Sequence, residues 1–147
     1  MGLPCEAVDR DTLAAQADVI ITITSCFEPL LTADQSRPGT HIACMGTDTA
    51  GKQEIDPAIL AGAQVFTDAP EQARTIGESQ HAVAQGLIAA DDLRAIGEVI
   101  DAPDSLSRPA DAITVFDGTG VGLQDLAVAR VAVERAAEAG TASEIAW

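Results

Sequence analysis

The chain has 147 residues, of which 47% are apolar, 21% charged and 3% aromatic, a composition that supports one hydrophobic core. Its 8 Lys and Arg residues stand against 23 Asp and Glu residues, which gives a formal net charge of −15 at pH 7. These values exclude a large multidomain protein and an unfolded chain. The negative balance also argues against a nucleic-acid partner, because phosphate binding needs clustered Lys and Arg.

Segments for export or membrane insertion are not expected. The most hydrophobic stretch, residues 17–23, is short and contains Asp18 and Thr22. The start of the chain has no basic region followed by an apolar run, so it does not resemble a secretory signal. The three cysteines are odd in number and lack CxxC spacing. They predict free thiols in the reducing cytoplasm, with no membrane partner.

The first half of the chain predicts three strands in sequence. Residues 18–24 are β-branched and nearly continuous, which is typical of a strand buried on both faces, and residues 25–28 then form a loop. A second strand at 41–45 ends in a polar, glycine-bearing segment, and a third covers 63–67. Between these two, Asp56 and Pro57 have the residue types of a helix start, which predicts a short helix up to Gly62.

The second half predicts helices around a last strand. One helix is expected from residue 71 to about 86 and a short one over 93–100, followed by a strand at 113–116. A glycine-rich loop then leads into a long helix at 123–139, which Gly140 ends. This alternation predicts an α/β layer fold with a largely parallel sheet. Ligands in such folds collect at the carboxyl ends of strands, so the candidate loops are 24–28, 46–52 and 117–122.

The loop GTGVG at residues 118–122 lies between a predicted strand and a predicted helix. Glycines in this position can let the backbone approach a phosphate at the helix start. The spacing is GxGxG rather than GxGxxG, however, and no strand with a ribose-binding carboxylate follows. A tight strand-to-helix turn close to some ligand is therefore the better interpretation.

Asp48 and Lys52 are the strongest candidates for functional residues, because both lie in one glycine-bounded loop after a predicted strand. A carboxylate there could move a proton to or from a substrate amine, and the lysine could neutralise it or bind phosphate. The alternative is structural, with Asp48 forming a turn and Lys52 solvated at the surface.

Other polar residues give weaker signals. Glu78 and His81 are three residues apart on the predicted helix, but a third metal ligand is not evident, so a hydrogen-bonded or solvent-facing pair is expected and no metal. His41 at a strand start is expected to be structural. Cys26 and Cys44 lie near strand ends and are expected to behave as small buried apolar residues.

Three segments together resemble the ornithine cyclodeaminase/mu-crystallin family. They are ADVIITIT at 17–24, PGTHIACMGTDTAGKQE at 38–54 and ITVFDGTGVGLQD at 113–125. Residues 46–54 match the family pattern G-x-D-x-x-G-K-x-E, and the wording of 41–47 is most similar to the ectoine-utilisation cyclodeaminase-like subgroup. The resemblance runs from about Gly2 to the end of the long helix.

The resemblance implies a Rossmann-like, three-layer fold with NAD or NADP as cofactor. Residues 1–147 would form a partial NAD(P)-binding domain, with the strand and long helix at 113–139 packing back on it. The implied activity is hydride transfer at an amino-acid carbon–nitrogen bond, as in deamination of ornithine to a cyclic product. A ketimine or imino-acid reductase and a non-catalytic binding or assembly module remain open as alternatives.

Site residues follow from the same matched segments. Asp48 is implied as the acid/base carboxylate, and Thr119 as a residue close to the substrate, an amino acid or cyclic imine. The implied cofactor contacts are Thr24, Met45, Gly46, Thr47, Lys52 and Gly118. Because family members commonly have Ser at the position of Gly118, this chain lacks one hydroxyl there.

The resemblance covers only the C-terminal half of a family member. The preceding half of the family carries the GxGxxG fingerprint and the substrate-binding Arg and Lys. The strand at 18–24 would normally lie beside the fingerprint strand, so we expect it to present an open apolar edge. Such an edge predicts a homo-oligomer or an association with a separate N-terminal half.

Overall fold

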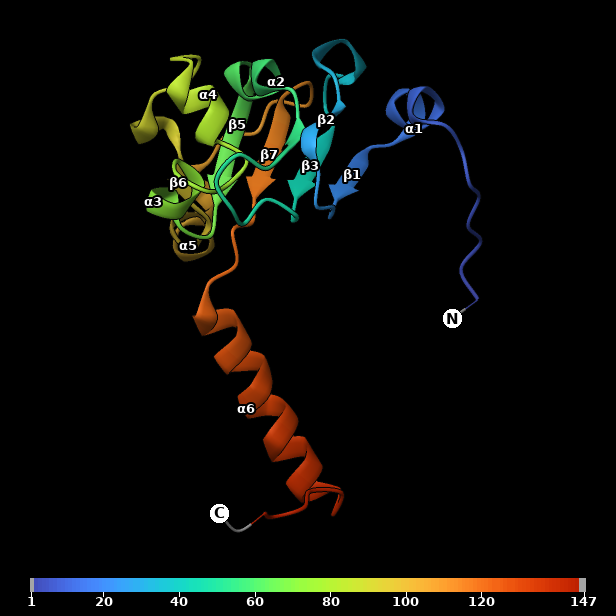
Figure 1. Ribbon diagram of the computed structural model, residues 1–147, viewed down its shortest axis with the longest axis vertical. Helices are drawn as coiled ribbons and strands as arrows, with labels where there is room; N and C mark the ends of the chain where they lie inside the picture. The colour runs from blue at the N-terminus through green and yellow to red at the C-terminus, as the bar shows by residue number, and fades with distance from the viewer. Residues whose placement is uncertain (1, 146–147) are drawn as a thin grey trace.

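The structure is a computed structural model that describes residues 2–145, and it contains two parallel sheets (Figure 1). The larger sheet has five strands in the order β1-β3-β7-β5-β6, and the smaller pairs β2 with β4. The strands are β1 (Val19–Thr22), β2 (Phe27–Leu31), β3 (His41–Cys44), β4 (Gln53–Ile55), β5 (Ala63–Thr67), β6 (Arg94–Ala95) and β7 (Ile113–Asp117). The prediction of an α/β fold with a parallel sheet is confirmed.

Helices connect these strands, as parallel pairing requires. They are α1 (Arg10–Gln16), α2 (Pro57–Ala61), α3 (Pro70–Ala73), α4 (Gln80–Ala84), α5 (Ile96–Asp101) and α6 (Gly122–Glu138). Three short 3-10 turns cover Ala33–Gln35, Ala90–Asp92 and Pro103–Ser105. Among these described helices, none combines the length and apolar character needed to cross a membrane.

The hydrophobic core lies between the sheet and its helices. Its centre is the strand residues Ile42 and Val115, both fully buried, and the helices add Ile59, Leu60 and Ala82. Asp56 caps α2 by accepting a hydrogen bond from the backbone N of Ala58, with Pro57 in the first turn, as predicted.

Three local predictions are wrong. The loop expected over 25–28 ends at Cys26, since Phe27 begins β2 and pairs with β4. The helix expected over 71–86 is two helices, α3 and α4, separated by a turn at 74–79. The short helix expected over 93–100 begins only at Ile96, because Arg94 and Ala95 form β6.

Strand β1 forms one edge of the large sheet, and one of its faces is open. The side chains of Val19 and Ile21 are 58% and 67% exposed, whereas Ile20 and Thr22 on the opposite face are buried. The prediction of burial on both faces is therefore wrong, because no described element covers this face. Asp18 and Thr22 carbonyls accept bonds from β3, so the backbone groups of Val19 and Ile21 point to the open edge. This is the apolar edge that the family resemblance implies.

The C-terminal segment separates into two parts. Strand β7 pairs with β3 on one side and with β5 on the other, so it lies in the middle of the sheet. Helix α6 projects away from the sheet, and none of its residues is buried (Figure 1). The expected packing of this helix on the domain is wrong, because residues 118–121 direct it outward and its apolar residues do not meet any described surface. Gly140 follows the helix with a φ of 65°, as a helix-ending glycine does.

Candidate functional site

Four loops meet at the carboxyl end of the large sheet. Because β1, β3, β7 and β5 are adjacent and parallel, the residues that follow them lie along one edge. Thr24 follows β1, residues 45–52 follow β3, residues 118–121 follow β7 and Asp68 follows β5. The three candidate loops of the sequence are thus brought together, and the fourth was not predicted.

Asp48 lies on the loop after β3 and forms an ion pair with Lys52. The Nζ of Lys52 lies 2.6 Å from Asp48 Oδ1 and also donates to the Gly46 carbonyl at 3.2 Å. The Asp48 side chain is 60% exposed and that of Lys52 only 16%. The hydrogen bond from Lys52 lowers the pKa of Asp48 below its ordinary value, and the Thr49 hydroxyl adds to this effect. The site therefore presents an anionic carboxylate at the surface, held by a mostly buried cation.

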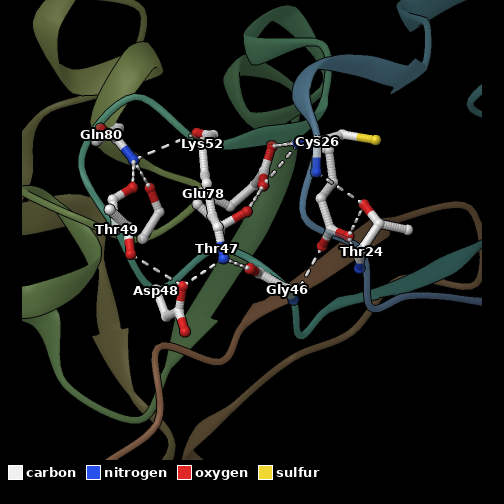
Figure 2. A network of polar contacts seen from close by, with 11 residues as sticks. Thr24, Cys26, Gly46, Thr47, Asp48, Thr49, Lys52, Glu78 and Gln80 are labelled. Atoms are coloured by element: carbon white, nitrogen blue, oxygen red, sulfur yellow. Dashed lines mark hydrogen bonds and ion pairs between the residues drawn. The ribbon is translucent and has the colours of Figure 1, made fainter.

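Glu54 joins the loop after β1 to the loop after β3. Its carboxylate is fully buried and accepts hydrogen bonds from both Thr22 and Thr24 hydroxyls, at 2.7 Å each. It also accepts from the backbone N of Thr24 at 2.5 Å and of Gly46 at 3.0 Å (Figure 2). A Cβ on Gly46 would lie 2.3 Å from the Thr24 carbonyl oxygen, so this close approach requires glycine.

Thr47 forms a buried hydrogen bond with Glu78. The Thr47 side chain is fully buried and donates its hydroxyl to Glu78 Oε2 at 2.5 Å. It therefore stabilises the loop and does not face the surface as a cofactor contact would. The expected pairing of Glu78 with His81 on one helix face is wrong, because α4 begins only at Gln80 and Glu78 lies in the preceding turn. Burial raises the pKa of Glu78.

Thr119 is held by Asp68, at the end of β5. Asp68 accepts hydrogen bonds from the backbone N and hydroxyl of Thr119, at 3.1 and 2.7 Å, and from Gly120 N at 2.8 Å. Burial opposes ionisation of Asp68, but these hydrogen bonds lower its pKa overall. The Thr119 side chain is consequently buried, and its hydroxyl is already used within the protein.

Gly118 lies against Met45, which explains why this chain has no side chain there. A Cβ on Gly118 would lie 2.8 Å from Met45 Sδ, so a serine would require Met45 to move. Met45 is 41% exposed and forms an apolar surface between the ends of β3 and β7. Thr24 is also exposed, whereas Gly118 is buried and donates its backbone N–H to the Cys44 carbonyl.

Sequence reasoning missed four supporting carboxylates. These are Glu54, Asp68, Glu78 and Asp117. Only Glu54 had a signal, as the last residue of the G-x-D-x-x-G-K-x-E pattern. The other three act through partners that are distant in sequence, which a single sequence does not reveal. Within residues 2–145, no group of three His, Cys, Asp or Glu side chains could hold a metal ion.

Comparison with known proteins agrees with this geometry. Residues 3–140 match the family described as the ornithine cyclodeaminase/mu-crystallin family. The chain belongs to this family. It is 54% identical over 145 residues to an iminosuccinate reductase of Paracoccus denitrificans, which covers 99% of this chain and 45% of that protein. An alanine dehydrogenase of Archaeoglobus fulgidus is 41% identical over 133 residues, which is 90% of this chain and 41% of that protein.

Solved structures of the family share the fold described above. The crystal structure of the Paracoccus denitrificans iminosuccinate reductase in complex with NAD⁺ matches 99% of this chain with a TM-score of 0.91 and 53% identity. The match covers 45% of that structure's chain. The family member described here thus spans about half the length of the relatives that it matches.

Proposed function

We propose that this chain contributes the proton-handling side of an NAD(P)-dependent enzyme that reduces the carbon–nitrogen double bond of a small 2-imino acid. The observation that carries the proposal is the Asp48–Lys52 pair, an exposed carboxylate held at the carboxyl edge of a parallel sheet. Its support is the similarity to an iminosuccinate reductase and an alanine dehydrogenase. Both names describe chemistry at the carbon–nitrogen bond of a small amino acid.

The residues at this edge fit one end of a nicotinamide cofactor. Met45 offers a half-exposed apolar surface beside Gly118, while Thr24 and Lys52 both lie against Gly46, the residue that follows Met45. When bound, the cofactor supplies the hydride that reduces the imine carbon. The part of the chain that the structure describes has no GxGxxG turn, so a diphosphate-binding loop would come from another part of the complete enzyme.

Asp48 would hold and orient the protonated substrate nitrogen. Because its pKa is lowered, the carboxylate is anionic at neutral pH and attracts a protonated imine nitrogen by charge. The proton reaches the site on the imine nitrogen, so hydride addition to the imine carbon gives the neutral amine and Asp48 stays ionised. In the reverse direction the same carboxylate accepts the proton from the amine. Lys52 keeps Asp48 ionised until the substrate cation arrives.

Reduction takes precedence over ring-closing deamination of ornithine as the proposed reaction. The relatives described above are named as a reductase and a dehydrogenase, and neither name includes ring closure. Both reactions share hydride transfer at a carbon–nitrogen bond, so the Asp48 site serves either. They differ in their products, which makes the choice an experimental one.

Split-enzyme assembly tests the proposal. The purified chain is mixed with the remaining segment of the Paracoccus denitrificans iminosuccinate reductase, and complex formation is measured by sedimentation. NADH oxidation is then followed with oxaloacetate and ammonium, which form iminosuccinate, and with ornithine. We expect aspartate from the assembled complex only. An assembled complex without turnover would refute the proposal, and proline release from ornithine would favour deamination.

The Asp48→Asn variant tests the proton-handling role in the same complex. Asparagine keeps the size of the side chain but carries no negative charge and cannot accept the proton, so turnover should fall by about 10²- to 10⁴-fold. Asp91→Asn is the matched control, because Asp91 is exposed and lies outside the site. Turnover of Asp48→Asn within a few-fold of the unmodified complex would show that Asp48 has another role.

A further inference from the structure

The loop that carries Asp48 is fixed by hydrogen bonds from the segment 77–81, which lies outside the loop in the sequence. Three side chains of this segment form hydrogen bonds to the loop or to the strand that follows it: Glu78, Gln80 and His81. None of the three contacts the Asp48 carboxylate directly in the described structure. All three therefore influence Asp48 through the backbone and through Thr47 and Lys52.

Glu78 is a buried carboxylate that forms no ion pair with any residue in the range 2–145. It is 1% exposed, and its donors are the Thr47 hydroxyl at 2.5 Å, the backbone N of Glu54 at 2.9 Å and the backbone N of Ile55 at 2.8 Å. Burying a carboxylate is unfavourable unless hydrogen bonds compensate for the lost water. All of its partners lie on the loop that carries Asp48 or on β4, which immediately follows. The hydrogen bonds that stabilise the buried Glu78 carboxylate therefore also fix this loop, at Thr47 and at the start of β4.

Gln80 and His81 hold the turn in which Lys52 lies. Gln80 accepts a hydrogen bond from Gly51 N at 2.7 Å and donates to the carbonyls of Lys52 and Thr49, at 3.3 and 3.4 Å (Figure 2). The Nε2 of His81 lies 3.0 Å from the Lys52 carbonyl oxygen. The backbone of the lysine that pairs with Asp48 is therefore held by two side chains of α4.

The segment 77–81 is in turn attached to the centre of the sheet. Asp117, the last residue of β7, accepts hydrogen bonds from the backbone N of Glu78 and Ser79, at 3.0 and 2.8 Å, and from the Ser79 hydroxyl at 2.7 Å. A Cβ on Gly77 would lie 2.7 Å from Asp117 Oδ1, so glycine permits the contact. The holding segment is thus anchored to a buried strand and is not a free surface turn.

The geometry points to Glu78 and Gln80 as positioning residues that keep Lys52 and Asp48 paired and in place for the proton step. This inference rests on the proposed function for its catalytic consequence, but the pairing itself exists in the chain alone. Neither residue touches the reacting atoms. Their effect is to keep the carboxylate in one position, because a displacement of about 1 Å in a catalytic group can lower a rate by about 100-fold.

The pairing can be measured in the chain without catalysis. In Gln80→Met, which keeps the length of the side chain but removes its hydrogen bonds, we expect the pKa of Asp48, measured by carbon NMR, to rise toward its ordinary value. Exchange of the Gly51 amide hydrogen should become about tenfold faster. Gln85→Met is the matched control, since Gln85 is an exposed glutamine at the end of the same helix. An unchanged Asp48 pKa in Gln80→Met would overturn the inference.

Glu78 variants in the assembled enzyme test the catalytic consequence. Glu78→Gln keeps a partner for each donor, because its amide can donate to the Thr47 oxygen and its carbonyl can accept from the backbone N of Glu54 and Ile55. It loses only the second, 3.0 Å contact of the Glu54 N–H, so kcat should stay close to normal. Glu78→Ala should lower kcat by about 100-fold while KM for NADH stays unchanged. Equal kcat values for the folded Ala and Gln variants would refute positioning by Glu78, and Gln80→Met gives the same comparison if Glu78→Ala does not fold.

These readouts separate the two proposals. A shift of the Asp48 pKa in Gln80→Met together with an inactive unmodified complex would retain the positioning role and reject the proposed reaction. Turnover that depends on Asp48 but is insensitive to both Gln80→Met and Glu78→Ala would retain the reaction and reject the positioning role.

Discussion

At the scale of single residues, the site depends on buried carboxylates that form no ion pair within the part of the chain that the structure describes. Glu54, Glu78 and Asp117 are buried and are stabilised by backbone and hydroxyl donors. The one ion pair in the loop, between Asp48 and Lys52, lies at the surface. Networks of buried polar groups are costly when incomplete, so each of these carboxylates restricts its loop to one arrangement. The buried carboxylates thus fix the loops, whereas the Asp48–Lys52 pair provides the charge at the surface of the site.

Asp117 gives this arrangement a measurable pH dependence. Burial raises its pKa to about 6, above the unfolded value of 3.8, although its hydrogen bonds oppose the shift. The folded state therefore binds the proton more readily than the unfolded state, and this group's favourable contribution is lost as the pH rises through about 6. Each unit of pKa shift corresponds to about 1.4 kcal/mol. We expect the unfolding free energy to fall by at least this order between about pH 5 and 7 on account of Asp117.

Comparison with Asp117→Asn isolates this effect by urea unfolding at each pH. The variant should be less stable overall, because an amide cannot accept all three hydrogen bonds. Its stability should nevertheless lack the decline near pH 6. The comparison is needed because the lowered pKa of His41 also makes the unfolding free energy depend on pH. Its contribution lowers the stability of the protein as the pH falls through 6.5. Parallel pH curves for the two proteins would contradict a raised pKa of Asp117.

The local sequence predicted the positions of the loop residues better than the contacts that support them. The sequence places Asp48 and Lys52 in one loop after a strand, and the structure pairs them there. The contacts of Glu78 could not be predicted, since its partners Thr47 and Ile55 lie 31 and 23 residues away. Thr47 and Thr119 match the family pattern, but burial of their side chains follows from contacts with Glu78 and Asp68 that the pattern does not contain.

At the scale of elements, regular strands were predictable and interrupted helices were not. The strand predicted at 63–67 has the same bounds in β5. A short apolar run between a glycine and a proline is typical of a strand. The helix predicted over 71–86 is interrupted where Asp117 binds residues 78 and 79. Strand β2 was missed because it contains Pro29 and pairs only with the three-residue β4.

Strand β1 predicts self-association. Its open edge has unpaired backbone groups and the exposed side chains of Val19 and Ile21, a combination that favours pairing with another strand. We expect the chain to form oligomers, and Ile21→Lys to weaken them by about tenfold or more, because burial of an isoleucine contributes about 1.5–3 kcal/mol. Sedimentation velocity over a range of concentrations measures this change.

Ile100→Lys is the matched control for the β1 edge. Ile100 is 74% exposed but lies on α5, away from β1. Its replacement should leave the oligomers intact. If both lysine variants dissociate equally, or if the unmodified chain sediments as a monomer at all concentrations, association through β1 is wrong.

At the scale of the whole molecule, the chain combines an ordered sheet with surfaces that lack partners. It matches 45% of the length of the iminosuccinate reductase, and its unpartnered surfaces are the β1 edge and helix α6. Five large apolar residues of α6 are exposed: Leu123, Leu126, Val128, Val131 and Val133. These apolar residues of α6 have no packing partner within residues 2–145.

Removal of α6 tests whether it is independent of the sheet. No α6 residue is buried. The free energy of unfolding of a chain that ends at Val121 should therefore lie within about 0.5 kcal/mol of that of the original chain, as expected for changes to exposed residues. Urea unfolding followed by fluorescence of a tryptophan placed at Phe66 would report on the sheet in both proteins. Phe66 lies in β5 and is 7% exposed, so the probe senses the core. A loss of several kcal/mol would mean that α6 packs against the sheet in solution. Unchanged stability would mean that α6 is available for a partner while β7, which precedes it, keeps the Asp117 anchor in place.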